Sequence, residues 1–476
     1  MLNKILQNLK NYPDDECYQI KKNIYKNKDL YKYVCNIYDY VLKNNKNKKP
    51  IVVKGHKQIY MVASFLACSM AGFTYVPIDE YIPSEREEKI LRQVNPDLII
   101  DEKIENIMKK EHPKAIEKIY LKDEDIYYII FTSGTTGEPK GVQITYRNLK
   151  SCMAWLEKIC DVKQKTILNQ ANFSFDLSVA DLYLPLLTRG KHYILEKDTL
   201  KKYIELFKEL KESNAELMVV TPSFIDLLLI DKSFNKNLMP NLKEILFCGE
   251  RLSENTVTRL WNRFENLKII NCYGPTECTF AVTSNVVKTN DKISIGIPKE
   301  DVKLYIVDNA LHELKENEIG EILISGESVG NGYLNEELNK DVFINFNGEK
   351  AYLTGDLGYK SKEKFFCIGR KDRQIKYKGY RIELSEIEAA INKLEFVEKA
   401  VVVADLGEDK KVNKIFAFIK QFEGNKKDVK EIREIIKNCL PDYMIPVIRI
   451  VENFPLNVNG KIDEKKLLEK NRWIIF

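Results

Sequence analysis

Residues 127–141 have the sequence YYIIFTSGTTGEPKG, in which an apolar run passes directly into a loop of glycine, serine and threonine. The apolar run Tyr127–Phe131 predicts a buried strand. Glycines let the main chain approach a polyanion closely, and hydroxyl and main-chain N–H groups donate the hydrogen bonds that phosphate oxygens accept. The stretch therefore predicts a strand ending in a phosphate site, formed by Thr132, Ser133, Gly134, Thr135, Thr136, Gly137 and the charged Lys140.

The alternative interpretation of this loop is a polar surface turn. Three glycines, four hydroxyl residues and a lysine directly after an apolar strand argue against that alternative. The loop is not a Walker A motif, because Lys140 is followed by Gly141 and not by serine or threonine.

Apolar strands and amphipathic helices alternate on both sides of the loop. This rhythm predicts an α/β fold with mostly parallel sheets and helices on both faces. The expected strands are Pro50–Lys54, Thr74–Ile78, Leu98–Ile100, Leu217–Thr221, Glu244–Cys248 and Lys268–Cys272. The expected helices are Ile59–Ala71, Pro83–Val94 and Pro222–Ile230.

The pattern changes near residue 293, where short strands separated by turns predict a small β-rich subdomain over about 293–370. Its expected strands are Lys303–Val307, Gly320–Ser325, Ala351–Leu353 and Phe365–Gly369. From residue 371 a helix (Ser385–Leu394), two strands (Lys399–Ala404 and Lys414–Ile419) and a helix (Lys427–Cys439) predict a small mobile α+β domain. We expect a large domain over 1–370 and a small domain over 371–476, with a hinge near Asp372.

Composition narrows the class of protein. A chain of 476 residues is too long for one ordinary core, which is consistent with several domains. The net charge of +5 is too balanced to indicate nucleic acid or an anionic membrane as a partner. The ten cysteines include no CxxC pair, and the chain has neither a signal-peptide pattern nor an apolar run long enough for a membrane span. We expect a cytoplasmic protein with reduced thiols.

Two further motifs end expected strands with residues suited to a nucleotide. In Asn271–Glu277 (NCYGPTE), Tyr273 can stack on a base, Thr276 can bond a phosphate and Glu277 can bind Mg²⁺. In Tyr352–Asp356 (YLTGD), the carboxylate of Asp356 is expected just past a strand, where it can accept both hydroxyls of a ribose. Each motif on its own is also typical of an ordinary turn.

Two more motifs lie towards the C-terminus. Arg370, in GRKDRQIK, can form forked hydrogen bonds with a phosphate or a ribose, and the sequence KGYRIE with Gly379 follows it. Lys461 lies in PLNVNGKID, which alone is typical of a surface lysine in an Asn/Gly turn.

Taken together and in this order, the five motifs resemble the adenylate-forming superfamily of acyl-CoA synthetases, luciferases and nonribosomal peptide synthetase adenylation domains. The resemblance covers nearly the whole chain. It implies a two-step reaction, in which a carboxylate attacks the α-phosphate of ATP to give an acyl-adenylate, and a thiol then displaces AMP. The small domain of such enzymes rotates between the two steps about a hinge, which Asp372 matches.

The resemblance also implies a role for each matching residue. The loop from Thr132 to Lys140 would bind the β- and γ-phosphates of ATP, and Glu277 would bind Mg²⁺. Asn271 would contact the adenine edge beside Tyr273 and Gly274, and Asp356 would contact the ribose hydroxyls. The catalytic residues would be Lys461, which bridges the substrate carboxylate and the α-phosphate, with Thr276 and Arg370. Gly379 would line the passage for the thiol arm.

The segment Phe173–Val179 (FSFDLSV) indicates the kind of acid. In amino-acid-activating members an aspartate at this place pairs with the substrate ammonium group, and Asp176 matches it. A buried carboxylate without a partner is costly, so such a site expects a cation. The alternative is that Asp176 merely caps the helix that follows.

The closer resemblance is to the D-alanine–D-alanyl carrier protein ligases. It is carried by the FSFDLSV segment together with Gly55-His56, Ser64–Leu66, Pro83–Arg86, Thr221–Phe224 and Phe247–Glu250. These enzymes load D-alanine onto the phosphopantetheine of a carrier protein for later esterification of teichoic acids, and Cys248 matches a cysteine that helps to select the D-enantiomer. The implied amino acid pocket comprises Asp176, Leu177, Cys248, Gly249, Cys272, Phe280 and Ala281. Against the family pattern, Ala180 replaces Met, Cys272 replaces Thr and Phe280 replaces a small aliphatic residue.

Three alternatives remain open at this stage. The first is a free-standing adenylation enzyme for another small amino acid, which the three departures permit. The second is an acyl- or aryl-CoA synthetase, against which Asp176 argues because an apolar acid offers no ammonium group. The third is an ATP-binding module without turnover, against which the joint presence of Glu277, Asp356 and Lys461 argues.

Overall fold

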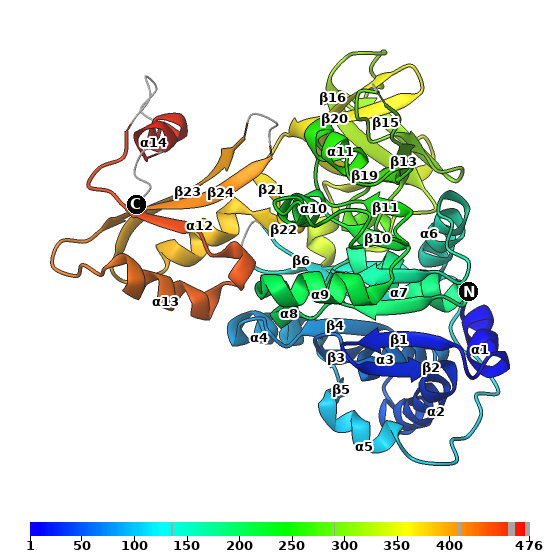
Figure 1. The fold of residues 1–476 in the computed structure, drawn as a ribbon. Coiled ribbons are helices and arrows are strands. Elements are labelled where there is room, and N and C mark those ends of the chain that lie inside the picture. Colours follow the sequence, from blue (N-terminus) through cyan, green and yellow to red (C-terminus); the bar gives the residue numbers. More distant parts are fainter. Residues whose placement is uncertain (135–136, 290, 408–410, 456–461, 472–476) are drawn as a thin grey trace. The chain divides into compact units, whose positions relative to one another are not determined.

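The computed structural model describes residues 1–134, 137–289, 291–407, 411–455 and 462–471. These residues form two compact units (Figure 1). Unit 1 comprises residues 1–80, 91–131 and 141–371, and unit 2 comprises residues 81–90, 132–140 and 372–476. The phosphate loop is therefore grouped with the C-terminal part of the chain.

Unit 1 contains a large sheet, sheet A, whose central strands are parallel. Its order is β14 (Ile297–Pro298), β13 (Thr283–Val286), β12 (Lys268–Tyr273), β11 (Glu244–Phe247), β10 (Leu217–Val220), β8 (Thr166–Asn169), β9 (Lys191–Ile194), β1 (Glu16–Ile20) and β2 (Asn23–Lys26). The strands from β12 to β1 in this order pair in parallel, whereas β13, β14 and β2 are added at the two ends of the sheet by antiparallel pairing. The α/β class predicted from the sequence is confirmed.

Sheet A is buried on both faces. Along β10, Leu217 and Val219 belong to one apolar core, while Met218 and Val220 belong to another. The first core also contains the helices α6 (Tyr146–Ile159) and α7 (Leu177–Thr188). The second contains α9 (Tyr203–Ser213), α10 (Pro222–Leu228) and α11 (Glu254–Trp261), while the short α8 (Lys197–Lys201) precedes α9. Parallel strands covered on both faces explain the uninterrupted apolar runs in the sequence.

A second sheet of unit 1, sheet B, contributes to the first core. Its order is β17 (Gly332–Tyr333), β7 (Lys140–Thr145), β6 (Ile126–Thr132), β4 (Tyr75–Asp79), β3 (Ile51–Gly55) and β5 (Ile99–Ile100). The helix α3 (Ile59–Met70) is apolar except for Ser64 and Ser69, and every residue in it is buried. Among the described residues, no helix is both long and apolar enough to cross a bilayer.

The segment before β3 carries structure that the sequence analysis did not predict. It forms α1 (Leu2–Asn11), the hairpin of β1 and β2, and α2 (Asn27–Asn44). Polar residues dominate this segment, yet Leu2, Ile5 and Leu9 recur on one face of α1 and are buried. After β5 follow a 3₁₀ turn (Glu102–Ile104) and α5 (Glu105–Met108), and α4 (Ser84–Val94) spans the boundary between the two units.

The predicted β-rich subdomain forms sheet C. Its strands are β15 (Val302–Val307), β16 (Gly320–Gly326), β19 (Glu349–Ser361) and β18 (Phe343–Phe346), with β20 (Lys364–Arg370) paired to β19; 3₁₀ turns occupy Thr276–Cys278 and Glu336–Asn339. The expected strand Ala351–Leu353 was far too short, because β19 has 13 residues. Asp356 therefore lies inside a strand and not just past its end. Gly355, at φ +73°, and a register shift at Leu357 interrupt the pattern without ending the pairing.

The C-terminal part of unit 2 has its own core. It comprises the hairpin β21 (Gln374–Tyr377) and β22 (Tyr380–Glu383), α12 (Leu384–Asn392), β23 (Val397–Leu406), β24 (Val412–Gln421), α13 (Val429–Cys439), a 3₁₀ turn (Asp442–Met444), β25 (Val447–Ile450) and α14 (Glu464–Asn471). Lys378 and Gly379 connect β21 to β22 at φ +52° and +83°, the left-handed conformation that two-residue hairpin turns favour. Asp428 caps α13 by accepting from the N–H groups of Lys430 and Glu431.

A buried polar cluster joins α7 to strands β8 and β9. Asn169 Nδ2 donates to both carboxylate oxygens of Asp181, at 2.9 and 3.0 Å, and His192 Nε2 lies 3.3 Å from Asp181 Oδ1. Burial raises the pKa of Asp181, and the contacts with His192 and Asn169 oppose that rise. The cluster fixes the helix that begins directly after Asp176.

A buried lysine holds the main chain that leaves the same two strands. Lys57 Nζ donates to the carbonyl oxygens of Gln170, at 2.8 Å, and Leu195, at 2.7 Å. Burial lowers the pKa of Lys57 to about 8. Because Gln170 directly follows β8, this lysine helps to set the start of the loop that leads to the FSFDLSV segment.

We predict that Asp181→Ala destabilises unit 1, because Asn169 and His192 lose their buried acceptor. The expected decrease in the free energy of unfolding is about 2–4 kcal/mol, measured by urea unfolding. Glu265→Ala, at an exposed site, serves as the control and is expected to change it by less than about 0.5 kcal/mol. An unchanged urea midpoint in Asp181→Ala would contradict a stabilising role for the cluster.

Candidate active site

The motif residues of unit 1 gather at the carboxyl ends of the parallel strands of sheet A. The FSFDLSV segment follows β8, Thr221 follows β10, Cys248 follows β11, and Tyr273 ends β12. Because parallel strands place their carboxyl ends along one edge, these residues line a single edge of the sheet. Ligands of open α/β sheets bind at this edge.

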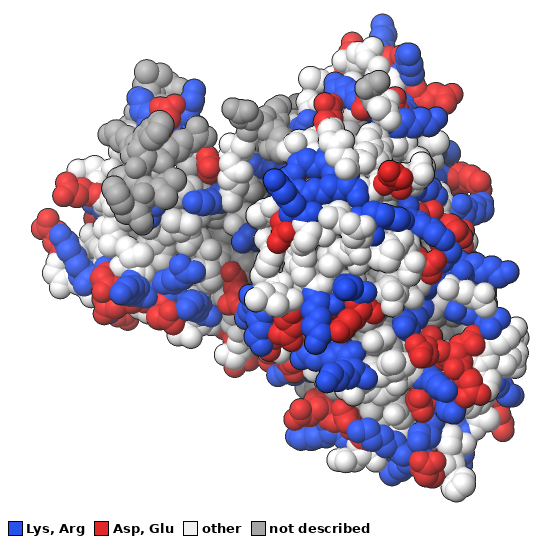
Figure 2. All heavy atoms as spheres, in the orientation of Figure 1, with Lys and Arg blue, Asp and Glu red and all other residues white. Residues whose placement is uncertain are grey.

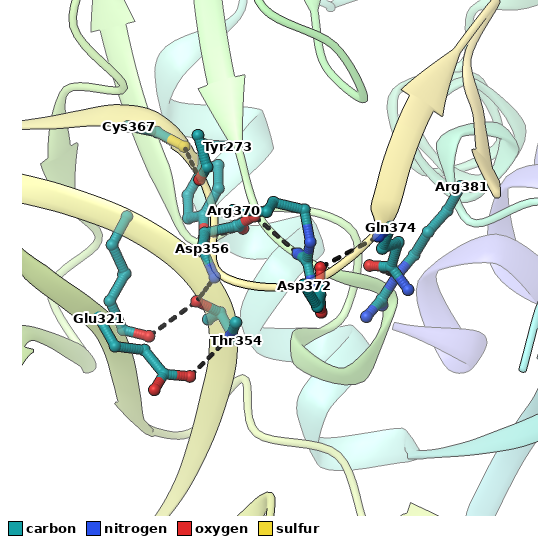
Figure 3. Close-up of polar contacts among 12 residues, drawn as sticks. Tyr273, Glu321, Thr354, Asp356, Cys367, Arg370, Asp372, Gln374 and Arg381 are labelled. Atoms are coloured by element: carbon teal, nitrogen blue, oxygen red, sulfur yellow. Dashed lines mark hydrogen bonds and ion pairs between the residues drawn. The ribbon is translucent and has the colours of Figure 1, made fainter. Parts of the chain in front are cut away.

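Asp356 accepts hydrogen bonds from two of the predicted nucleotide residues (Figure 3). The Tyr273 hydroxyl donates to Asp356 Oδ2 at 2.6 Å, and Arg370 Nη1 lies 2.6 Å from Asp356 Oδ1. Burial, followed by the neighbouring Asp356 carboxylate, raises the pKa of Tyr273 well above its ordinary value, so the phenol remains protonated. The structure thus brings Asp356 together with Tyr273, which is 83 positions away in the chain, and with Arg370, which is 14 positions away.

The backbone around Asp356 is held by side chains of sheet C (Figure 3). The Thr354 hydroxyl accepts from the N–H of Asp356 at 3.0 Å and donates to the carbonyl of Ile322 at 2.7 Å. Glu321 Oε1 accepts from the N–H of Gly355 at 2.8 Å. A carboxylate has about four lone-pair sites, so Asp356 can accept further hydroxyl groups beside Tyr273 and Arg370.

Glu277 is fully buried, and Tyr333 holds its carboxylate. Tyr333 is not among the residues predicted from the sequence. The Tyr333 hydroxyl donates to Glu277 Oε1 at 2.6 Å and lies 3.3 Å from the Tyr352 hydroxyl. Tyr333 lies on β17, which pairs with β7 directly after the phosphate loop. Only this pairing, which joins segments nearly 200 residues apart, identifies Tyr333; the local sequence contains no signal for it.

The end of β12 is closely packed. A Cβ at Gly274 would lie 2.6 Å from the Cα of Ala281 and 2.8 Å from the carbonyl of Phe280, so only glycine fits there. Thr279 and Phe280 have φ values of +60° and +70°, a left-handed conformation that is uncommon for such side chains and is concentrated at functional sites. Asn271 Nδ2 donates to the carbonyl of Ser294 at 2.8 Å, which fixes the orientation of its amide.

Asp176 precedes α7, but its side chain makes no capping hydrogen bond. The helix-cap alternative is therefore not supported. Burial, with Tyr75 and Asp176 as lesser causes, raises the pKa of Tyr128 on β6. The charge of Asp176 thus acts on the protein interior, where a carboxylate favours a cationic partner.

The other expected pocket residues lie at neighbouring strand ends. Phe247 pairs with Asn271, so Cys248 and Cys272 follow side by side on β11 and β12. Both thiols are buried, and Cys248 Sγ lies 3.8 Å from the carbonyl oxygen of Phe280. Burial is the main cause that raises the pKa of Cys272, and the neighbouring Cys248 is the second. Gly249 has φ +90°, which explains a glycine after Cys248. Leu177, Phe280 and Ala281 are also buried.

The described part of the phosphate loop lies in unit 2. A Cβ at Gly134 would lie 2.1 Å from the carbonyl of Glu138, and Gly137 has φ +79°, so both positions require glycine. The Ser133 hydroxyl donates to the carbonyl of Arg381 at 2.7 Å. Thr135, Thr136 and Lys461 lie outside the described residues.

Glu386 of α12 faces this loop. Its Oε2 accepts from the N–H of Gly134 at 3.2 Å, and its Oε1 lies 2.6 Å from Arg86 Nη1 on α4. Lys89 Nζ donates to the carbonyl of Gly137 at 3.2 Å. A cavity of about 130 Å³ adjoins these groups and is also lined by Lys393 and Cys439. The carboxylate of Glu386 thus bonds one N–H of the loop that the sequence analysis assigns to phosphate.

The first residues after Arg370 form a polar chain in unit 2 (Figure 3). Asp372 Oδ1 accepts from the N–H of Gln374 at 3.2 Å. The Gln374 side chain donates to Glu383 and accepts from Arg381, both at 2.5 Å. Burial raises the pKa of Glu383, and the charge of Lys140 is the largest opposing cause. The hairpin that carries Gly379 is thus tied to the segment that begins at Asp372.

Within the described residues, no group of three or more His, Cys, Asp or Glu side chains could hold a metal ion alone. A single carboxylate such as Glu277 is nevertheless consistent with Mg²⁺, which one or two carboxylates often bind together with the phosphates of a substrate. The Mg²⁺ role of Glu277 stays a prediction.

Two family models match the chain. Residues 6–334 match the model of the AMP-binding enzyme family, and residues 386–461 match the model of the AMP-binding enzyme C-terminal domain. The adenylate-forming resemblance predicted from the motifs is therefore confirmed. ATP use is implied by this family.

Similar proteins extend over nearly the whole chain. The D-alanine–D-alanyl carrier protein ligase of Listeria monocytogenes serotype 4a is 38% identical over 96% of each chain, and that of Bacillus licheniformis is 38% identical over 88% of this chain and 89% of its own. Among solved structures, the Vibrio cholerae adenylation domain AlmE with glycyl-adenosine-5'-phosphate superposes with a TM-score of 0.86, at 22% identity over 98% of this chain and 97% of its own. That structural likeness supports the fold alone, while the sequence matches show that the chain belongs to the AMP-binding enzyme family.

Proposed function

We propose that the protein activates D-alanine with ATP as D-alanyl-AMP and transfers it to the phosphopantetheine thiol of a carrier protein. The observation that carries the proposal is the position of Asp176, a carboxylate directly before α7, at the same sheet edge as Cys248 and Cys272. An amino acid supplies the ammonium group that such a carboxylate favours, whereas an apolar acid does not. The relatives named as D-alanine–D-alanyl carrier protein ligases support the choice of amino acid.

For the nucleotide, Asp356 binds the ribose hydroxyls, with Tyr273 and Arg370 holding its carboxylate in place. Asn271 contacts the adenine edge beside Gly274, which permits the close approach of Phe280 and Ala281. The loop from Thr132 to Lys140 binds the β- and γ-phosphates through main-chain N–H groups and hydroxyls.

Mg²⁺ bound to ATP would neutralise charge on the phosphates, and Glu277 is the residue that would hold it. Tyr333 keeps the Glu277 carboxylate in one orientation by donating to Oε1. Thr276, directly before Glu277, supplies a hydroxyl to the phosphates. Thr276 and Glu277 lie in the same 3₁₀ turn, which follows β12.

In the first step, the substrate carboxylate attacks the α-phosphorus and pyrophosphate leaves. Lys461 offsets the negative charge that develops on the α-phosphate, and Arg370 supports the same region. In the second step, the thiol attacks the acyl carbon and AMP leaves. We assign the change between the steps to a hinge at Asp372, between the domains 1–370 and 371–476, and the thiol passage to Gly379.

Activation of another small amino acid is a second candidate. Ala180 is buried and smaller than the methionine of the family pattern, while the buried Phe280 is larger than the usual residue there. These two changes alter the shape of the pocket in opposite directions. D-alanine remains the first candidate because Cys248, the residue that distinguishes the enantiomers, is present. The fate that the resemblance implies for the thioester is D-alanylation of teichoic acids, with the enzyme in the cytoplasm.

Amino-acid-dependent pyrophosphate exchange tests the proposal. We expect D-alanine to be preferred over L-alanine, glycine and D-serine, and Cys248→Ala to reduce the ratio of D- to L-alanine activity about tenfold, because it removes the sulfur beside the substrate methyl group. Cys160→Ala, another buried thiol, is the control and should leave the ratio unchanged. A preference for glycine or D-serine would favour the second candidate, and exchange with none of these acids would refute both.

Tyr333→Phe tests how Glu277 is held. Loss of a hydrogen bond to a buried carboxylate should raise the Mg²⁺ concentration for half-maximal exchange by about tenfold, while the KM for D-alanine stays within about twofold. The control is Tyr305→Phe in sheet C, which should behave like the unsubstituted protein. Identical Mg²⁺ dependence in Tyr333→Phe and the unsubstituted protein would show that Tyr333 does not position Glu277.

A further inference from the structure

Four apolar side chains are exposed where α9 begins and α10 ends. Ile204 is 87% exposed, Ile230 72%, Leu227 42% and Tyr203 41%. Monomeric proteins expose single apolar residues often, but a contiguous apolar group with a polar rim is typical of a docking surface.

A hydrogen bond joins the start of α9 to the segment that follows α10. The Tyr203 hydroxyl is bonded to the Asp231 carboxylate, so Ile204 and Ile230 lie one residue away on either side of the contact. Ile230 lies in the turn that follows α10, where its N–H donates to the carbonyl of Leu227 at 3.3 Å. Tyr203 also packs on Phe207, with 4.5 Å between ring centroids. We call Tyr203, Ile204, Leu227 and Ile230 the apolar patch.

The apolar patch lies on well-anchored structure and does not belong to the core. Directly beneath it, Leu228 and Leu229 are completely buried. Arg263 Nη2 donates to the carbonyl of Leu229 at 2.9 Å, and Arg259 donates to the same oxygen. These bonds fix the end of α10, and the patch side chains can be replaced without opening a cavity.

The rim of the apolar patch is mainly basic. Lys201, Lys202, Lys232 and Lys236 are exposed on the segments that carry the patch. Figure 2 shows further Lys and Arg side chains gathered over α10 and α11. Of the nearby acids, Asp231 is bonded to Tyr203, and Glu205 lies 3.4 Å from Lys202. An apolar centre with this rim complements a partner whose surface is acidic around an apolar centre.

The apolar patch also lies towards the edge of sheet A that holds the site. Helix α9 leads into the start of β10 and runs back along it, so the first turn of α9 lies near the carboxyl end of that strand. Helix α10 begins directly after β10, and the Ser223 N–H donates to Glu250 Oε2 at 2.9 Å, next to Cys248 and Gly249. The starts of α9 and α10 therefore both lie at the carboxyl edge of sheet A, the edge that also holds Cys248 and Gly249.

We propose that the apolar patch and its basic rim dock the carrier protein through an acidic surface around apolar side chains. This inference rests on the proposed function, because it identifies where the partner of the second step binds. The apolar residues supply most of the affinity and the lysines increase the rate of association.

The test uses Ile204→Asp/Ile230→Asp in the full chain, with the cognate carrier protein in its phosphopantetheinylated form. We expect kcat/KM for carrier loading to fall at least about tenfold, because two carboxylates replace apolar contacts and repel an acidic partner. D-alanine-dependent pyrophosphate exchange and the transfer of D-alanine to free pantetheine should stay within about twofold of the unsubstituted protein. The matched control is Ile319→Asp, at an isoleucine 60% exposed in the loop before β16, and it should load the carrier normally.

A second variant tests the rim. Lys232→Glu should reduce loading mainly at low ionic strength, because screening by salt weakens the attraction of exposed charges. Normal carrier loading by the double variant would overturn the docking site. A change in oligomeric state of the double variant, measured by light scattering, would overturn it in favour of contact between two copies of this chain. Absence of D-alanine-dependent exchange in the unsubstituted protein would instead refute the proposed function itself.

Discussion

The burial of sheet A on both faces is the constraint on which the site depends. Alternate residues of β10 enter two separate cores, so no polar side chain is placed along the length of that strand. Polar and charged groups are instead concentrated where the parallel strands end. Asp176, Cys248 and Tyr273 all follow or end such strands, although they are distant in the chain. One edge of the sheet thus holds residues that we propose bind the amino acid and the nucleotide.

The site contains several carboxylates that are buried or half-buried. Asp356 is stabilised by Tyr273 and Arg370, and Glu277 by Tyr333. Asp176 is half-buried and lies directly before the buried helix α7. Holding these carboxylates in place costs free energy, which hydrogen bonds offset. The proposed chemistry assigns a ligand to each carboxylate: ribose hydroxyls to Asp356, Mg²⁺ to Glu277 and the ammonium group of an amino acid to Asp176.

Much of the fold and the family could be predicted from the sequence, because both depend on local patterns. Apolar runs followed by glycine-rich or polar loops mark the strand ends, and the order of five motifs identified the adenylate-forming resemblance. Asp356 was misplaced because Thr354 and Gly355 are typical of a turn, whereas β19 continues through them by a register shift. Tyr333 was missed because only the pairing of β17 with β7 brings it near Glu277. The contact of Glu386 with the phosphate loop likewise depends on tertiary structure.

In the function that we propose, Asp176 recognises the ammonium group of D-alanine beside the nucleotide site. The most direct measurement is calorimetric binding of D-alanyl-sulfamoyl-adenosine, a stable analogue of the adenylate, to the unsubstituted protein and to Asp176→Asn. The variant keeps the shape of the side chain and removes its charge. We expect tight binding to the unsubstituted protein and binding at least about 100-fold weaker to Asp176→Asn, with AMP binding equally well to both. Equal affinity of the two proteins for the analogue would contradict this role of Asp176.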